Sequence, residues 1–411
     1  MTVSATKLLI YSADFWPTVG GIQSVVMALA RGLTDSKGVS TIECTVATET
    51  PQGTASDNDL PFRVVRRPNV VKLARLIWQA DLVHVAGPAL RPLILGGLFR
   101  KKIVVEHHGF HALCPNGLLF HEPTRTPCSG HFLAGNHREC WKCNAGSGNL
   151  RSLRLWALTF CRRWFCRSAA ANIVPTNWLA AFLKLPNTSV IPHGVAELAS
   201  LPPSHFGFDR SDKKMRFAFI GRLVSTKGVD LLLYASRELQ DKGFEFKVVI
   251  IGDGPERKHL EALSAALALK DVEFAGQVSD ADAQMLTRDA LAVVIPSVAG
   301  EVFGLVAAEN MMLGHAVVVP DQGALAEIVG KNGLKFTPGD VTSLAYCMEY
   351  LLRSPSASNE LGARARCYSL GRFRAAEMTH CHLKLYQRVV TGTAWQGDSL
   401  VADSTATGTR T

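Results

Sequence analysis

The sequence predicts an α/β protein built from two domains, each a parallel sheet covered by helices on both faces. Short apolar runs of strand length alternate along the chain with longer segments of helical period, and this alternation is typical of parallel sheets. With 411 residues, 47% of them hydrophobic and 19% charged, the chain is long enough for two or three domains with sizeable cores. Its formal net charge of +9 indicates either a generic basic surface or attraction to an anionic lipid or substrate.

The first domain is expected to span residues 1–196. Its first strand leads into Asp14-Phe-Trp-Pro-Thr-Val-Gly-Gly-Ile22, a loop with two adjacent glycines. A helix is expected next, at 22–33, because its apolar residues recur with helical period. Strands are expected at 7–12, 42–48, 62–66, 81–87, 102–108, 171–176 and 189–193.

The rest of the chain predicts a linker, a second domain, a final helix and a tail. The alternation lapses at 197–214, where Pro202-Pro203 and a charged run indicate the linker. It resumes over 215–370, which predicts the second domain, and the periodic segment at 371–390 predicts one more helix. Residues 391–411 are rich in Thr, Gly, Ser and Ala, so we expect a disordered tail.

The most informative stretch is Glu301-Val-Phe-Gly-Leu-Val-Ala-Ala-Glu309, which carries two carboxylates eight positions apart. A buried strand is predicted before it, at 291–296, and a short helix at 303–313, which ends at Gly314. The helix N-terminus would then present three main-chain N–H groups, those of Phe303, Gly304 and Leu305. Such orphan donors, together with the helix dipole, favour an anion such as a diphosphate.

The two carboxylates would repel that anion, so they are better suited to accept hydrogen bonds from neutral hydroxyls of a sugar or a ribose. On this interpretation the stretch belongs to a nucleotide-sugar site. The alternative is that Glu301 is a helix-start acid favoured by the dipole, and that Glu309 is a solvated surface residue.

Further motifs surround the glutamate pair. Gly221-Arg-Leu-Val-Ser-Thr-Lys-Gly228 and Ile250-Ile-Gly-Asp-Gly-Pro-Glu256 each follow an apolar strand, and Gly323-Ala-Leu-Ala-Glu-Ile-Val329 lies downstream. In this order and spacing, and with the first glycine loop, they resemble the retaining glycosyltransferases of family 4, of the glycosyltransferase group 1 type. The resemblance covers roughly residues 7–390 and rests on several ordered motifs. It implies the GT-B fold of two facing Rossmann-like domains, with the helix at 371–390 returning to the first domain.

The resemblance also implies roles for four side chains of the second domain. Arg222 and Lys227 match family positions that contact the donor diphosphate and can replace a metal ion. Glu309 matches the position that binds the ribose, and Glu301 the position that contacts the donor sugar. The alternative for Arg222 and Lys227 is that they are solvated loop charges.

In the first domain the resemblance points to two glycines and a histidine. Gly20 and Gly21 would let the backbone approach the diphosphate or the reacting sugar, although a tight turn alone would also explain them. His108 aligns with a family histidine near the donor sugar, where it would hydrogen-bond a sugar hydroxyl. His107 is adjacent and could be mistaken for it, and a lone histidine at the end of a strand is more often structural.

No cofactor is expected in catalysis, because Arg222 and Lys227 would stabilise the leaving group of a UDP- or GDP-sugar donor. Two Asp-x-Asp pairs occur, Asp57-Asn-Asp59 and Asp280-Ala-Asp282. Neither indicates a catalytic metal strongly, since the first lies in a polar loop and the second opens a helix.

An insertion at 109–150 departs from the family pattern. It carries four cysteines and ends in a Cys-x-x-Cys motif: Cys114, Cys128, Cys140 and Cys143. A small insert without a core of its own would be stabilised by a structural zinc ion on these thiolates. Ordinary reduced cysteines, an iron–sulfur cluster or a disulfide are the alternatives.

The segment 150–167 alternates Leu, Trp and Phe with five arginines, which indicates a basic helix at a membrane surface. Trp156, Phe160 and Trp164 are four apart and would share one face, although a core-facing helix with extended arginines is the alternative. The sequence shows no signal peptide and no membrane span. We therefore expect a cytoplasmic protein, peripheral on the inner face of the cell membrane, and no nucleic-acid module is visible.

Together these expectations describe a retaining hexosyltransferase that acts on a glycan or a lipid-linked acceptor in cell-surface polysaccharide or glycolipid synthesis. One alternative is a sugar-nucleotide epimerase or hydrolase. Another is a catalytically silent GT-B scaffold that binds a partner through its Cys-rich insert. The presence of Glu301, Glu309 and the two cations argues against a silent scaffold.

Overall fold

The computed structural model describes residues 5–18, 20–35, 42–53, 56–144, 146, 148–196 and 214–392. The chain forms two compact units. The first unit comprises Met1–Pro123, Ser129–Ala196 and Arg372–Thr411, and the second comprises Thr124–Cys128 and Glu197–Gly371. Apart from Lys214, Thr391 and Gly392, the predicted linker and tail lie outside the described residues.

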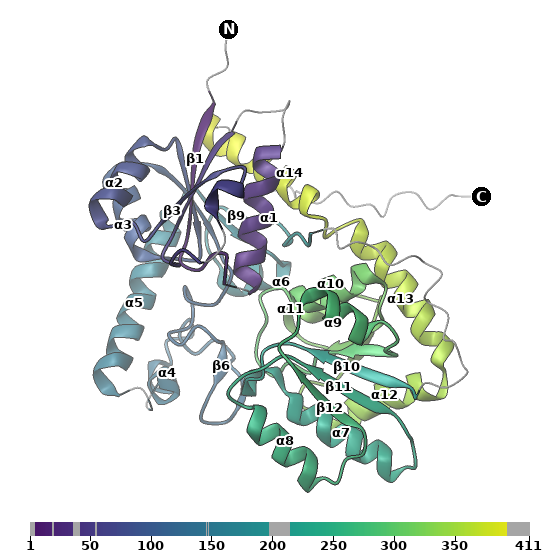
Figure 1. Cartoon of the computed structure of the whole chain (residues 1–411). Coiled ribbons are helices and arrows are strands. Elements are labelled where there is room, and N and C mark those ends of the chain that lie inside the picture. The colour runs from purple at the N-terminus through teal and green to yellow at the C-terminus, as the bar shows by residue number, and fades with distance from the viewer. Residues whose placement is uncertain are drawn as a thin grey trace, which may run out of the picture. The chain divides into compact units, whose positions relative to one another are not determined.

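The first unit is built on a seven-stranded parallel sheet in the order β3-β2-β1-β4-β5-β8-β9 (Figure 1). The central strand β4 is buried along its whole length, as expected for a sheet covered on both faces. From β3 to β1 the strands run across the sheet against their order in the chain, and from β4 onward they follow it, so the order reverses between β1 and β4. The strands are β1 (Thr6–Ser12), β2 (Ile42–Thr48), β3 (Arg63–Arg66), β4 (Leu82–Ala86), β5 (Lys102–Glu106), β8 (Ala171–Val174) and β9 (Thr188–Val190).

The helices of the first unit include the last one of the chain. Helix α1 (Gly21–Asp35) buries Val25, Val26, Leu29, Ala30 and Leu33 with the predicted period. Helix α14 (Ala375–Thr391, yellow in Figure 1) packs against α1. The other elements are η1 (Asp57–Asp59), α2 (Val70–Gln79), α3 (Leu90–Leu98), β6 (Phe120–His121), β7 (Thr126–Pro127), α4 (His137–Asn144), α5 (Asn149–Arg167) and α6 (Asn177–Leu183).

The second unit repeats the same strand order in a six-stranded parallel sheet, β12-β11-β10-β13-β14-β15. The order of the strands across this sheet reverses, relative to their order in the chain, between β10 and β13. Phe217, Phe219 and Phe246 belong to a core in which side chains of β10, β11 and β13 pack with those of α7 and α12. The strands are β10 (Arg216–Ile220), β11 (Lys247–Ile251), β12 (Val272–Gly276), β13 (Ala292–Val294), β14 (Val317–Pro320) and β15 (Leu334–Phe336).

Helices cover both faces of this second sheet (Figure 1). They are η4 (Ser225–Lys227), α7 (Val229–Asp241), α8 (Arg257–Ala266), α9 (Asp280–Thr287), α10 (Leu305–Leu313), α11 (Gly323–Val329), α12 (Val341–Arg353) and α13 (Pro355–Leu370). The structure therefore confirms two Rossmann-like units and a C-terminal helix in the first of them. Across the described part of the chain, every helix is too short or too polar to cross a membrane.

Candidate functional site

Two loops of the second unit bring Lys227 and Glu301 together, although 74 residues separate them in the chain. Lys227 ends the 3-10 helix that follows β10, and Glu301 lies between β13 and α10. These strands are neighbours at the point where the strand order reverses. Open α/β sheets bind their ligands beyond the carboxyl ends of the strands at such a switch point.

A short ion pair and a backbone hydrogen bond join the two loops. Lys227 Nζ donates to Glu301 Oε1 at 2.5 Å, and Ser297 Oγ donates to the same oxygen at 2.9 Å. The N–H of Val298 donates to the carbonyl of Thr226 at 3.0 Å. Burial alone would raise the pKa of Glu301, but the Lys227 ammonium and the Ser297 hydroxyl hold it below its ordinary value. Glu301 is therefore an ionised acceptor.

Two glycines shape these loops, and both have positive φ. Gly228 (φ 64°) follows Lys227, and a Cβ there would collide with the carbonyl oxygen of Pro296. Gly304 (φ 97°) precedes α10, and a Cβ there would collide with the Leu325 side chain. The helix starts at Leu305, two residues later than predicted, so Gly304 is its N-cap. Phe303 lies before the helix, with a ring only 1% exposed, and so packs in the core.

Glu309 lies on α10 and is largely shielded from solvent. Burial, together with the nearby charge of Asp280, raises the pKa of Glu309 to about 7. Asp280 opens α9, whose N-cap Ser279 accepts a hydrogen bond from the Asp282 N–H at 3.2 Å. The Asp280-Ala-Asp282 motif thus forms a helix start beside Glu309, and the Glu309 carboxyl changes protonation near neutral pH.

Arg222 is exposed on the loop that follows β10. Its neighbour Leu223 fixes this loop to the next one, donating to the carbonyl of Asp253 at 2.9 Å and accepting from the N–H of Glu256 at 3.1 Å. The loops predicted from the glycine motifs are therefore joined through their backbones. The Arg222 side chain remains accessible to a ligand.

In the first unit, Gly21 begins α1 and Gly20 precedes it. A Cβ at Gly20 would approach the end of the flexible Gln23 side chain, at 2.6 Å. The nearest atoms that a side chain at Gly20 would meet therefore belong to a flexible group that can move. The Asp57-Asn-Asp59 motif forms η1, and Asp57 is engaged in an ion pair with Arg66 at 2.7 Å.

The two adjacent histidines after β5 have different surroundings. His107 Nε2 lies 3.0 Å from Asn172 Oδ1. The Asn172 amide nitrogen donates to two backbone carbonyls, so its oxygen accepts and His107 donates. Burial lowers the pKa of His107 to about 4, which makes it a neutral core residue. His108 instead lies with its Nε2 3.3 Å from Glu106 Oε2 and stacks on His193.

Glu106 is the centre of a histidine cluster that the sequence did not predict. Four imidazoles lie within 3.7 Å of its carboxylate, those of His84, His108, His193 and His382. Burial alone would raise the pKa of Glu106, but the surrounding histidines hold it well below its ordinary value. Two signals were available: His84 is a polar residue inside an otherwise apolar strand and Glu106 ends the next one, and buried charges are normally paired.

The four cysteines of the insert are divided between the units. Cys140 and Cys143 lie one turn apart on α4, and hence on one face. Cys143 Sγ contacts the carbonyl of Phe120 at 3.9 Å, and Asn116 donates to the same carbonyl at 3.4 Å. The Cys114 thiol in turn donates to Asn116 at 2.9 Å. Cys114 and Cys143 are thus linked only indirectly, through Asn116 and the Phe120 carbonyl, whereas Cys128 belongs to the segment grouped with the second unit.

The predicted basic helix forms as α5, and two of its three aromatic rings contact the insert. Trp156 and Phe160 both contact the His137 ring of the insert. Arg163 is also engaged, because it donates to the carbonyls of Leu183 and Lys184. The exposed side chains include Leu150, Leu153, Phe160 and Trp164 together with Arg151, Arg154 and Arg167. Part of α5 is therefore a packing helix, as the alternative interpretation proposed.

Parts of the chain are similar to known glycosyltransferases. Residues 203–367 match the family model for glycosyl transferases group 1. The chain is 33% identical over 153 residues to D-rhamnosyltransferase WbpZ of Pseudomonas aeruginosa, covering 36% of this chain and 39% of that protein. It is 29% identical over 205 residues to phosphatidyl-myo-inositol mannosyltransferase of Mycobacterium leprae, covering 49% of this chain and 54% of that protein. The chain thus spans about half or less of the length of these relatives.

Most of the chain is similar in structure to HepE of Anabaena, solved in complex with UDP and glucose. The TM-score is 0.69 at 19% sequence identity, and the match covers 93% of this chain and 99% of HepE. The fold is GT-B. This confirms the fold class predicted from the alternating pattern and the ordered motifs, and the family match places the glycosyltransferase signature over the second unit.

Proposed function

We propose that the protein is a retaining glycosyltransferase of family 4 that moves a hexose from a UDP- or GDP-sugar to a glycan or lipid-linked acceptor. The observation that carries the proposal is the Lys227–Glu301 ion pair at the switch point of the second unit, beside the start of the helix that bears Glu309. The matched family region includes all three residues. The names of the two relatives, a rhamnosyltransferase and a mannosyltransferase, support a sugar donor.

The proposed donor site separates recognition of charge from recognition of hydroxyls. Transfer expels a nucleoside diphosphate, so positive charge must be preorganised beside it. Arg222 and Lys227 supply this charge, and the main-chain N–H groups at the start of α10 add donors. Glu301 and Glu309 accept hydrogen bonds from the sugar and the ribose. Donor binding would draw Lys227 toward the diphosphate and free Glu301 for the sugar.

His108 is the proposed contribution of the first unit, through a hydrogen bond to a hydroxyl of the transferred sugar. Glu106 lies 3.3 Å from its Nε2 and would orient the ring. The Glu106 side chain is 0% exposed, so it is unsuited to attack an anomeric carbon. We therefore propose front-face attack assisted by the leaving phosphate, which retains the configuration at that carbon.

The acceptor side is proposed to work at an anionic membrane surface on the cytoplasmic face, in glycolipid or cell-surface polysaccharide synthesis. The support comes from the exposed residues of α5, where Leu150 is 82% and Trp164 63% exposed. Exposed arginines lie on the same helix. Apolar side chains among basic ones are typical of helices that lie in the membrane interface. The relative named as a phosphatidyl-myo-inositol mannosyltransferase supports a lipid-linked acceptor.

The insert is proposed to bind one structural zinc ion through Cys114, Cys128, Cys140 and Cys143. The shared face of Cys140 and Cys143 supports this set. So do two contacts near the Phe120 carbonyl: Cys143 contacts it directly, and Cys114 donates to Asn116, which bonds to the same carbonyl. Four thiolates close a tetrahedral shell and leave no position for a catalytic water. The ion would hold the insert together, and the sugar chemistry would not pass through it.

The direct test of the proposed function is incubation of the purified chain with a panel of nucleotide sugars and a cell extract, followed by mass spectrometry. We expect binding of one donor, release of its nucleoside diphosphate and a product heavier by one hexose. Hydrolysis or epimerisation without transfer, or no turnover of any donor, would contradict the proposal.

Replacing Glu309 with Ala is expected to weaken donor binding while the fold stays intact. Removing the charged acceptor of ligand hydroxyls costs on the order of 1.5–3 kcal/mol, or about ten- to a hundredfold in affinity. Because the pKa of Glu309 is raised to about 7, affinity for a nucleotide sugar should increase as the pH rises through this value and the carboxyl ionises. Calorimetry at several pH values measures both effects.

The matched control for Glu309 is Glu360→Ala, which removes an exposed acid on α13 and should leave affinity unchanged. Glu309→Gln keeps the shape and should abolish the pH dependence. Unchanged donor affinity in Glu309→Ala would refute the ribose assignment.

Replacing Arg222 or Lys227 with Ala should lower turnover at least tenfold, about 1.4 kcal/mol in the barrier, and should lower turnover more than it disturbs folding. Each change removes positive charge beside the leaving diphosphate, and Lys258→Ala on the exposed face of α8 is the charge-matched control. Steady-state kinetics and thermal unfolding separate the two effects. Activity should survive brief EDTA treatment, and activity that returned only with added Mg²⁺ or Mn²⁺ would contradict the metal-free account.

The chain should sediment with anionic vesicles, and less so as salt increases. Three exposed arginines contribute about 1 kcal/mol each near a charged surface, screened at high ionic strength. Arg151→Glu with Arg154→Glu should abolish sedimentation. Arg364→Glu, which changes an exposed arginine on α13, should not. Binding that is absent, or indifferent to salt, would leave α5 as a packing helix only.

Replacing Cys140 and Cys143 with Ser should disorder the insert and make it sensitive to protease, because loss of two thiolates opens the proposed zinc shell. Limited proteolysis followed by mass spectrometry locates the cuts, which should fall within residues 109–150. Cys367→Ser, at an exposed cysteine of α13, is the control. Four thiols that react freely in the folded wild-type protein would argue for packing cysteines.

A further inference from the structure

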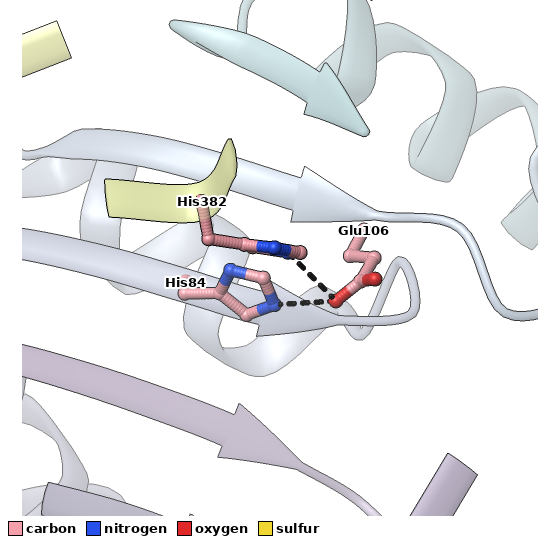
Figure 2. Close-up of side chains that lie close together, drawn as sticks. All are labelled: His84, Glu106 and His382. Atoms are coloured by element: carbon pink, nitrogen blue, oxygen red, sulfur yellow. Dashed lines mark ion pairs between the residues drawn. The ribbon is translucent and has the colours of Figure 1, made fainter. Parts of the chain in front are cut away.

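Two histidines converge on one carboxylate oxygen inside the first unit (Figure 2). His84 lies on β4, Glu106 ends β5, and His382 comes from α14. His84 Nε2 lies 3.1 Å, and His382 Nε2 3.7 Å, from Glu106 Oε2. All three side chains are 0% exposed, and their ligating atoms lie within 4.8 Å of one another. The cluster joins three elements that are distant in sequence.

The far side of each imidazole ring is already held by a hydrogen bond. His382 Nδ1 lies 2.8 Å from the backbone carbonyl of Met378, which can only accept. Nδ1 therefore carries the hydrogen, and in the neutral ring Nε2 presents a lone pair toward Glu106. His84 Nδ1 lies 2.8 Å from the hydroxyl of Tyr386. A hydroxyl can donate or accept, so this contact orients the His84 ring without fixing its tautomer. A second partner that orients the ring is a regular feature of metal-ligating histidines.

A lone pair that faces a carboxylate requires a cation between them, either a proton or a metal ion. A shared proton would place the carboxylate oxygen along the N–H direction of the ring. The observed geometry is different. The Nε2 atoms of His84 and His382 make no hydrogen bond, and the two carboxylate oxygens of Glu106 make none either. With a metal, each lone pair points at the ion and the ligand atoms lie beside one another, about 3.3 Å apart for bonds of about 2.0–2.1 Å. The distances of 3.1 and 3.7 Å bracket that value.

We propose that His84, Glu106 and His382 bind one divalent transition-metal ion, with zinc the ion that this donor set favours. Two imidazoles and a carboxylate are borderline ligands suited to zinc. The ion is structural, because its ligands are fully buried and it ties α14 to the central strands of the sheet. This site is separate from the proposed thiolate site of the insert, and it shares Glu106 with the proposed positioning of His108.

The test measures metal in the full chain, purified without a histidine tag and without chelator. Elemental analysis should find one equivalent of zinc fewer in Glu106→Gln and in His382→Gln than in wild type. His107→Gln is the matched control, because His107 is an equally buried neighbour that bonds to Asn172, and its zinc content should equal that of wild type. The Cys140→Ser and Cys143→Ser variant should lose a different equivalent, so the two losses should add.

A second measurement keeps the proposal testable if the variants fail to fold. Zinc-edge X-ray absorption of the wild-type protein should show nitrogen or oxygen neighbours at about 2.0–2.1 Å, distinct from any sulfur shell at about 2.3 Å. Zinc accounted for by sulfur ligands alone would overturn the proposal, as would wild-type protein that holds no metal and takes none up from added Zn²⁺. Either result would mean that a proton occupies the cluster.

Discussion

The ion pair between Lys227 and Glu301 holds together the two loops on which the proposed donor site depends. Both side chains are partly shielded, with exposed fractions of 30% and 20%. A shielded carboxylate without a cation would be costly, so each loop stabilises the charge carried by the other. The glycines on either side, Gly228 and Gly304, leave no room for a Cβ. The geometry therefore presents an ammonium, a carboxylate and a helix N-terminus together at the strand ends.

Much of the fold was predicted from local patterns in the amino-acid sequence. Alternating strands and helices predicted two parallel sheets, and the helical period predicted the buried face of α1. The positions of Gly221, Gly304 and the glutamate pair predicted which loops would form the proposed donor site. What local pattern cannot give is contact between residues far apart in the chain. The Lys227–Glu301 ion pair spans 74 residues, and nothing in either motif shows that the two groups meet before a ligand binds.

The same limit explains what the sequence did not show in two regions of the first unit. Helical spacing correctly placed Trp156, Phe160 and Trp164 on one helix, but spacing does not reveal that two of them contact the insert. Glu106 lies next to the predicted His107 and His108, yet its partners His84 and His382 come from other elements. Buried polar residues in apolar strands were the available signal. The interior of this unit is consequently more polar than the hydrophobic pattern implied.

The central claim is that the diphosphate of the donor binds at the carboxyl ends of β10 and β13. Hydrogen–deuterium exchange of the full chain, with and without saturating UDP or GDP, tests it most directly. At least one nucleotide is predicted to slow exchange in peptides covering residues 221–228 and 297–309, where the ion pair and the start of α10 lie. Binding that slows exchange only elsewhere, or the failure of every nucleoside diphosphate to bind, would contradict the account.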